Sequence, residues 1–110
     1  MRIRNLSDVA FTELTVSTSE KAGDTIAFGN LLNGATSEYI RFTKAYPKAE
    51  IRAKINIGGS LVQFTTGPVN YTFMQYIGQD MITYEVYISN MANHELSISN
   101  LVLDAPLVVK

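Results

Sequence analysis

A run of aromatic residues in the second half of the chain is the first candidate for a binding site. Tyr71, Phe73 and Tyr76 lie close together, with Met74 and Ile77 beside them. Tyrosine suits interfaces that are half wet, because its ring is apolar and its hydroxyl forms hydrogen bonds. The run is therefore a candidate ligand-binding site for a glycan or a protein partner. The alternative, which is more common for such a run, is that it closes the open end of a β-sandwich core.

A basic stretch with interleaved aromatic residues is the second candidate. It comprises Arg41, Lys44, Lys48, Arg52 and Lys54, with Tyr39, Phe42 and Tyr46 between them. Such a strip can bind single-stranded nucleic acid or an anionic glycan. We favour the alternative that these residues form the solvated face of one or two strands, with lysines protecting a sheet edge. We therefore expect no nucleic-acid partner.

The residue types needed for catalysis are present, but their spacing predicts no active site. His94 is the only histidine, and its neighbour Glu95 would point to the opposite face of a strand, so we expect His94 to be an exposed loop residue. Ser60 follows Gly58 and Gly59 without the motif of a nucleophile elbow or a phosphate-binding loop. The carboxylates are scattered and lack calcium-loop spacing. We expect no catalytic residue, no metal and no cofactor; a small hydrolase built from dispersed carboxylates is the least favoured hypothesis.

Composition places the chain among small folded domains. Its 110 residues predict a single domain over residues 1–110, and 46% apolar residues argue against disorder. The formal charge of −1 gives no field that attracts nucleic acid or anionic lipid. The chain contains no cysteine, which excludes disulfides and thiolate chemistry. No apolar run approaches the ~18 residues that span a bilayer, and the first residues read as strand rather than as a signal peptide.

The clearest structural signal is a predicted hairpin over residues 49–64. Ala49, Ile51, Ala53 and Ile55 alternate with polar residues, and this period of two places one set of side chains in the core. Residues 57–60 read as the turn, because its two glycines reach positive φ without a clash. Residues 61–64 return as the second strand.

Further strands are expected along the whole chain, connected by polar or glycine-containing turns. They span residues 2–6, 11–18, 25–28, 36–43, 82–88, with Val86 inward, and 96–103, the last with a bulge near Ser99. A short edge strand is predicted over residues 107–109, and an irregular crossing segment over residues 69–77. Seven to eight short strands indicate an antiparallel sandwich or barrel, and we predict an all-β, antiparallel two-sheet β-sandwich.

Several short motifs run through most of the chain. They are Ile3-Arg4-Asn5-Leu6-Ser7, Gly29-Asn30-Leu31, Gly34-Ala35-Thr36-Ser37-Glu38-Tyr39, Tyr46 with Ala49, Pro68-Val69-Asn70-Tyr71, and a late strand with Tyr84. This set resembles small Bacteroidetes-type exported lipoproteins. The resemblance implies an immunoglobulin-like or transthyretin-like sandwich, exported to the cell envelope (periplasm or outer surface) and tethered by a lipidated cysteine ahead of the residues given. It implies no catalytic residue.

Together these observations predict a non-enzymatic binding or structural module of the cell envelope. The expected partner is an unknown protein or glycan of the envelope, with membrane contact only through the lipid anchor. The alternative is a carbohydrate-binding accessory domain that uses Tyr71, Phe73 and Tyr76. The chain is expected to be a monomer or a weak dimer joined through an edge strand.

Overall fold

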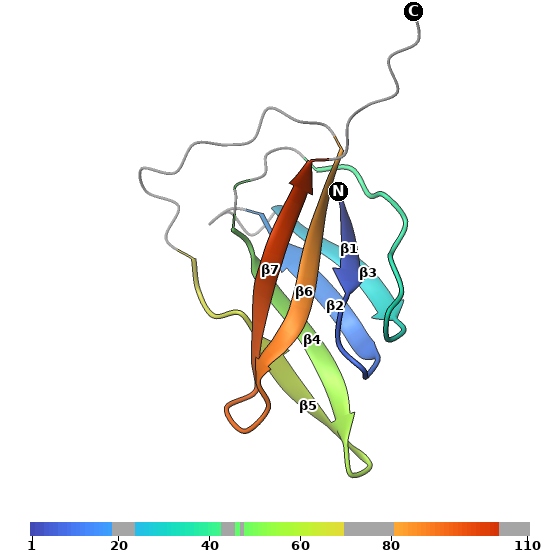
Figure 1. The fold of residues 1–110 in the computed structure, drawn as a ribbon, viewed down its shortest axis with the longest axis vertical. Coiled ribbons are helices and arrows are strands. Elements are labelled where there is room, and N and C mark those ends of the chain that lie inside the picture. Colours follow the sequence, from blue (N-terminus) through green and yellow to red (C-terminus); the bar gives the residue numbers. More distant parts are fainter. Residues whose placement is uncertain (19–23, 43–45, 47, 70–80, 104–110) are drawn as a thin grey trace, which may run out of the picture.

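The computed structural model describes residues 1–18, 24–42, 46, 48–69 and 81–103, and all their regular elements are strands (Figure 1). There are seven of them: β1 (Arg2–Asn5), β2 (Phe11–Ser17), β3 (Thr25–Leu31), β4 (Glu50–Ile57), β5 (Ser60–Thr65), β6 (Ile82–Asn90) and β7 (Glu95–Leu103). The all-β class is confirmed, and the predicted strands at residues 2–6, 11–18, 25–28, 82–88 and 96–103 are each present within a few residues of their expected bounds.

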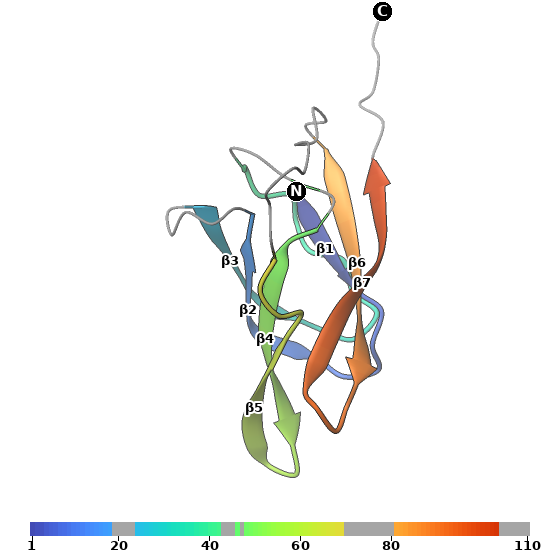
Figure 2. The same cartoon turned by 90° about the vertical axis from the view of Figure 1, so that its left-hand side faces the viewer.

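The strands form one rolled, nearly closed sheet in the order β1-β6-β7-β5-β4-β2-β3. One half of the sheet is built from β3, β2, β4 and β5, and the other from β1, β6 and β7; Figure 2 shows the two halves on either side of the core. The halves are joined where β5 meets β7, at the single pair Thr65 and Glu95.

The expectation of purely antiparallel pairing is wrong. β1 pairs with β6 in parallel, and so does β5 with β7. Alternation in a sequence reports which face of a strand is buried, but it does not report which strand lies beside it. After β1 the chain crosses to the other half and forms β2, so β1 has no hairpin partner, and it pairs in parallel with β6, a strand far away in the sequence.

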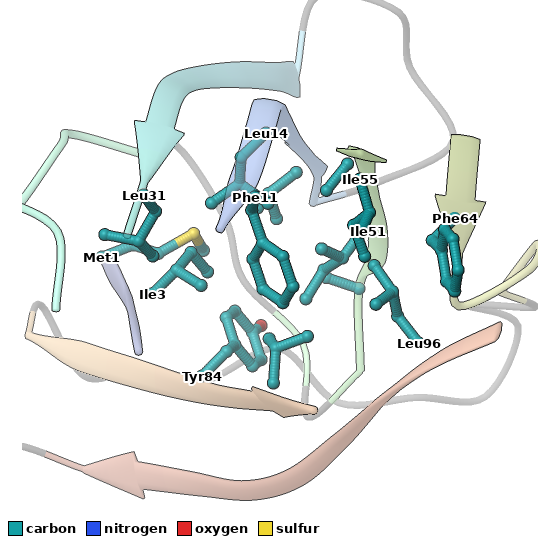
Figure 3. Close-up of a cluster of buried hydrophobic side chains, with 14 of the residues drawn as sticks. Met1, Ile3, Phe11, Leu14, Leu31, Ile51, Ile55, Phe64, Tyr84 and Leu96 are labelled. Carbon is teal, nitrogen blue, oxygen red and sulfur yellow. The ribbon is translucent and has the colours of Figure 1, made fainter. Parts of the chain in front are cut away.

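The core lies between the two halves. Figure 3 shows Phe11 from β2 and Tyr84 from β6 pointing toward each other there. Ile3, Ile51 and Val86 are fully buried, as their alternation predicted. Burial of a large aliphatic or aromatic side chain contributes about 1.5–3 kcal/mol, so these contacts hold the two halves together. The hydroxyl of the buried Tyr84 is hydrogen-bonded, since it donates to the Tyr46 carbonyl.

Two local predictions are confirmed by the backbone geometry. Gly58 and Gly59 both have positive φ, 59° and 91°, in the tight turn between β4 and β5. Such a turn matches the twist of an antiparallel hairpin. In the β6–β7 pair Glu85 faces Asn100 and Val86 faces Ile98, so Ser99 is the extra residue of a bulge.

The predicted strand over residues 36–43 is not a regular strand in its described part, residues 36–42. Only Thr36 forms a bridge, to Arg4. The segment follows the outer edge of β1 through separate hydrogen bonds, from Ser37 N to Ile3 O (2.8 Å) and from Ile40 N to Met1 O (2.7 Å). The predicted edge strand over residues 107–109 and the crossing segment beyond Val69 lie outside the described residues.

Candidate binding groove along strand β7

An open groove of about 660 Å³ runs along one edge of β7. One wall is β7 itself, from Leu96 to Leu101. The opposite wall is formed by residues on either side of the β4–β5 hairpin, namely Lys48, Ala49, Thr66, Pro68 and Val69. Since consecutive residues from both faces of β7 line the groove, it lies along the edge of the strand rather than over one face.

The groove exists because the chain leaves β7 directly after β5. Pairing of β5 with β7 is confined to Thr65 and Glu95; Thr65 N donates to the His94 carbonyl at 3.2 Å, and Thr66 N, which points to the other side of the chain, donates to the Ile51 carbonyl at 3.0 Å. The Thr66 hydroxyl accepts a hydrogen bond from Ile51 N (3.0 Å) and contacts the Ala49 carbonyl (3.2 Å). These bonds hold residue 66 against β4, and Figure 1 shows the chain after β5 bearing away from β7.

The groove-facing edge of β7 has no strand beside it among the described residues. Residues 96–103 pair with β6 on one side, and the pairing with β5 on the other side ends at Glu95. An unpaired strand edge presents a row of backbone N–H and C=O groups that can bind another strand. The chemistry of this edge is therefore main-chain hydrogen bonding.

Charge is sparse along this edge. Residues 96–103 carry no charged side chain, and Lys48 is the charged side chain among those that line the groove. Lys48 and Glu95 are both exposed, and within the described part of the chain neither forms an ion pair. Leu96 is buried, while Ile98 and Leu101 are half-buried against the core. A ligand therefore meets apolar surface, backbone polar groups, the neutral polar side chains of Ser97, Ser99 and Asn100, and one cation.

The edges at the two ends of the sheet, those of β1 and β3, are covered or irregular, while β5 from Ser60 to Phe64 has β4 as its neighbouring strand on one side and no strand on the other among the described residues. Residues 34–40, which we call the strap, cover the outer edge of β1 through four backbone hydrogen bonds of 2.7–2.9 Å, between residues 34–40 and residues 1–5. Gly29 interrupts β3 with a positive φ of 71°, and the β2–β3 register shifts beside it. Straps and kinks of this kind hinder pairing with another chain.

The buried amide of Asn5 binds the chain on either side of it, just before the strap begins. Its Nδ2 lies within hydrogen-bond distance of the carbonyls of Val9 (2.8 Å), Leu31 (3.2 Å) and Leu32 (3.3 Å). Its Oδ1 accepts from the backbone N–H (2.9 Å) and hydroxyl (2.6 Å) of Ser7. One side chain thus ties the end of β1 to the end of β3.

The residues singled out from the sequence are not brought together in a site. Tyr71, Phe73 and Tyr76 fall within residues 70–80, outside the described residues, so their role in ligand binding stays a prediction. Lys44 also lies outside the described residues.

The basic stretch is distributed over different surroundings. Arg52 pairs with Glu50 and Lys54 with Glu13, each at 3.0 Å. Phe42 packs against the core, while Lys48 reaches the groove. The residues of the stretch that are described therefore do not form one continuous cationic strip.

The residues considered for catalysis lie apart from one another. His94 is exposed in the turn between β6 and β7, as predicted, with its ring 5.0 Å from that of Phe64. Glu85 pairs with Arg4 at 2.6 Å. Within the part of the chain that the structure describes, no three histidine or acidic side chains are grouped so as to hold a metal ion. No helix there has the length and apolarity needed to cross a membrane.

The sequence reasoning missed the groove residues of β7. Ser97, Ser99 and Asn100 read as ordinary solvent-facing positions of a strand. The available signal was the absence of charge from residues 96–103, because an edge strand exposed to solvent usually carries a lysine or another charge.

Comparisons with protein-family models, with curated proteins and with solved structures found no match for this chain. The resemblance to exported lipoproteins therefore rests on its motif residues, and the groove rests on the geometry of β4, β5 and β7.

Proposed function

We propose that this chain is a non-enzymatic binding or structural module of the cell envelope and that the groove along β7 is its binding surface. The observation that supports this function is the unpaired edge of β7 beside a groove of about 660 Å³. Strand edges of this kind bind extended polypeptides through main-chain hydrogen bonds. The expected partner is a protein of the envelope.

The envelope location and the finer fold belong to the same proposal. The motifs from Ile3 to Ser7 and from Gly34 to Tyr39 resemble those of exported lipoproteins, which are tethered by a lipidated cysteine. The two halves of the sheet that face each other across the core are compatible with an immunoglobulin-like or transthyretin-like sandwich. Fractionation of cells that express the complete gene tests the location: the proposal predicts the chain in the membrane fraction, and a purely cytosolic chain would contradict it.

Site-specific photocrosslinking in the producing cells tests the binding surface. A benzoylphenylalanine at Asn100, which lines the groove, should give discrete adducts with a partner. The same probe at Glu38, which is exposed on the strap, is the matched control and should give none. Equal adduct patterns at the two positions, or none at Asn100, would contradict the proposal.

A carbohydrate-binding accessory domain is the second candidate function. The groove offers the hydroxyls of Ser97 and Ser99 and the amide of Asn100, which are groups that bind sugars through hydrogen bonds. Tyr71, Phe73 and Tyr76 would supply stacking surfaces. A glycan array decides between the candidates: sharp binding that is lost in Tyr71→Ala and Phe73→Ala favours the carbohydrate function, and no binding favours the protein partner.

A further inference from the structure

We propose that a second copy of this chain binds in the β7 groove, so that two β7 strands pair edge to edge and antiparallel across a two-fold axis near Ile98. This inference rests on the proposed role of the groove as a binding surface and names its first partner. Three features support it: the β7 edge that has no neighbour among the described residues, two charges that form no ion pair there, and the apolar side chains between them.

The edge itself favours a strand as the occupant. Beyond Glu95, the β7 edge that faces the groove has no neighbour among the described residues. Residues 96–103 carry no charge that would repel a copy of the same strand. β7 carries a bulge of its own at Ser99, a feature that hinders pairing with an unrelated strand; a second copy has the same twist by symmetry and can match it.

The two charges, Glu95 and Lys48, lie at different positions along β7. Glu95 begins β7, beside Thr65. Arg52 faces Thr65 in the β4–β5 pair, and Lys48 comes four positions before Arg52. Since β4 runs against β5 and β5 runs with β7, Lys48 lies about 13 Å further along β7 than Glu95 at 3.3 Å per residue, close to Ser99.

Antiparallel pairing brings these opposite charges together twice. With the axis near Ile98, Glu95 of the second copy lies opposite Leu101, about 7 Å further along β7 than Lys48 of the first copy, a gap that the two long side chains can span, and symmetry repeats the contact. Parallel pairing would instead place Glu95 beside Glu95 and Lys48 beside Lys48. Charge complementarity therefore selects the antiparallel arrangement.

The apolar residues between the charges fit the same arrangement. Ile98 lies at the axis and would contact its own copy, a favourable cross-strand pair of β-branched side chains. Ile98 and Leu101 are only half-buried in one chain, so a second strand would cover more of them. Contact along one strand edge falls at the small end of protein interfaces, and we expect a dissociation constant between about 10 μM and 1 mM.

A charge swap tests the proposal directly. Sedimentation equilibrium of the purified chain from about 10 μM to 1 mM should show a monomer–dimer equilibrium. Lys48→Glu alone and Glu95→Lys alone should each weaken it at least about tenfold, since each places like charges in contact. The double variant should return to within about threefold of the original. Both side chains are exposed, so folding should not change, and circular dichroism checks this.

Glu38→Lys is the matched control, because Glu38 is exposed on the strap at the far edge of the sheet; it should leave the dimer unchanged. A chain that stays monomeric at 1 mM, or a double variant no better than the single ones, would overturn the inference. Groove adducts with another protein at Asn100, together with a purely monomeric chain, would refute the dimer but leave the proposed function standing. A dimer that responds to the charge swap, without adducts to another protein at Asn100, would support the dimer and contradict the proposed function.

Discussion

The two outer edges of the β1-β6-β7 half differ in whether another segment of the chain covers them. The edge of β1 is covered by the strap, residues 34–40, with four backbone hydrogen bonds and the buried amide of Asn5 behind them. The edge of β7 is paired with β5 only at Glu95, and beyond it no strand among the described residues lies beside the groove. An unpaired edge favours association with other chains, and this difference between the edges is the reason why we propose the β7 groove as the binding surface.

The largest expected effect concerns the core that both edges share. Val86 is fully buried in β6, and Val86→Asp would bury a carboxylate without a partner. We expect it to abolish cooperative folding, so that both edges exchange amide hydrogens at the unfolded rate. Thermal melting followed by circular dichroism measures this. A cooperative melt close to that of the original chain would contradict the packing described.

Asn5→Ala should be the next largest effect, and it should act on the closed edge. It removes the side-chain donor to the carbonyls of Val9, Leu31 and Leu32; Ser7 Oγ still donates to the Val9 carbonyl and Ala35 N to the Leu32 carbonyl, whereas the buried bond to Leu31 is lost, and an unsatisfied buried group costs about 1–3 kcal/mol. We expect a loss of about 2–4 kcal/mol in the free energy of unfolding, measured by urea titration. Asn30→Ala is the control, since the Asn30 side chain makes one exposed contact, with Glu13 N at 3.3 Å. If Asn30→Ala lowered the free energy of unfolding as much as Asn5→Ala, the hydrogen bonds of Asn5 would not be specifically stabilising.

Ser37→Ala should have a smaller effect, confined to the strap. The Ser37 hydroxyl accepts a hydrogen bond from Ile3 N at 2.9 Å and lies 3.0 Å from the Glu38 carbonyl. A bond of this kind contributes about 0.5–1.5 kcal/mol. We expect faster exchange of the Ile3 amide and little change at β7. Ser60→Ala, in the β4–β5 hairpin, is the control, and unchanged exchange at Ile3 in Ser37→Ala would show that the strap does not protect β1.

The sequence predicts the strands well and their neighbours poorly. The alternation from Ala49 to Ile55, the glycine turn after it and the bulge at Ser99 are local signals, and the structure has all three. The parallel pairing of β1 with β6 joins residues about eighty positions apart, which no local pattern encodes.

The groove could not be predicted from the sequence for the same reason. It depends on where the pairing of β5 with β7 ends, at Thr65 and Glu95, two residues distant in sequence. Asn5 likewise reads as an ordinary polar residue at the end of a strand until its partners near Leu31 are known. The aromatic run at Tyr71 and Phe73 stays a prediction.

The most direct test of the account is amide hydrogen exchange, measured by NMR on the dilute monomer. The account predicts slow exchange at Asn5, Ser37 and Ile40, whose amides hold the strap. It predicts exchange at least about a hundredfold faster at those amides of residues 96–101 that do not donate to β6, and slowing of the same amides as the chain is concentrated. Equal protection of both edges in the dilute monomer would contradict it, because the β7 edge would then already be occupied.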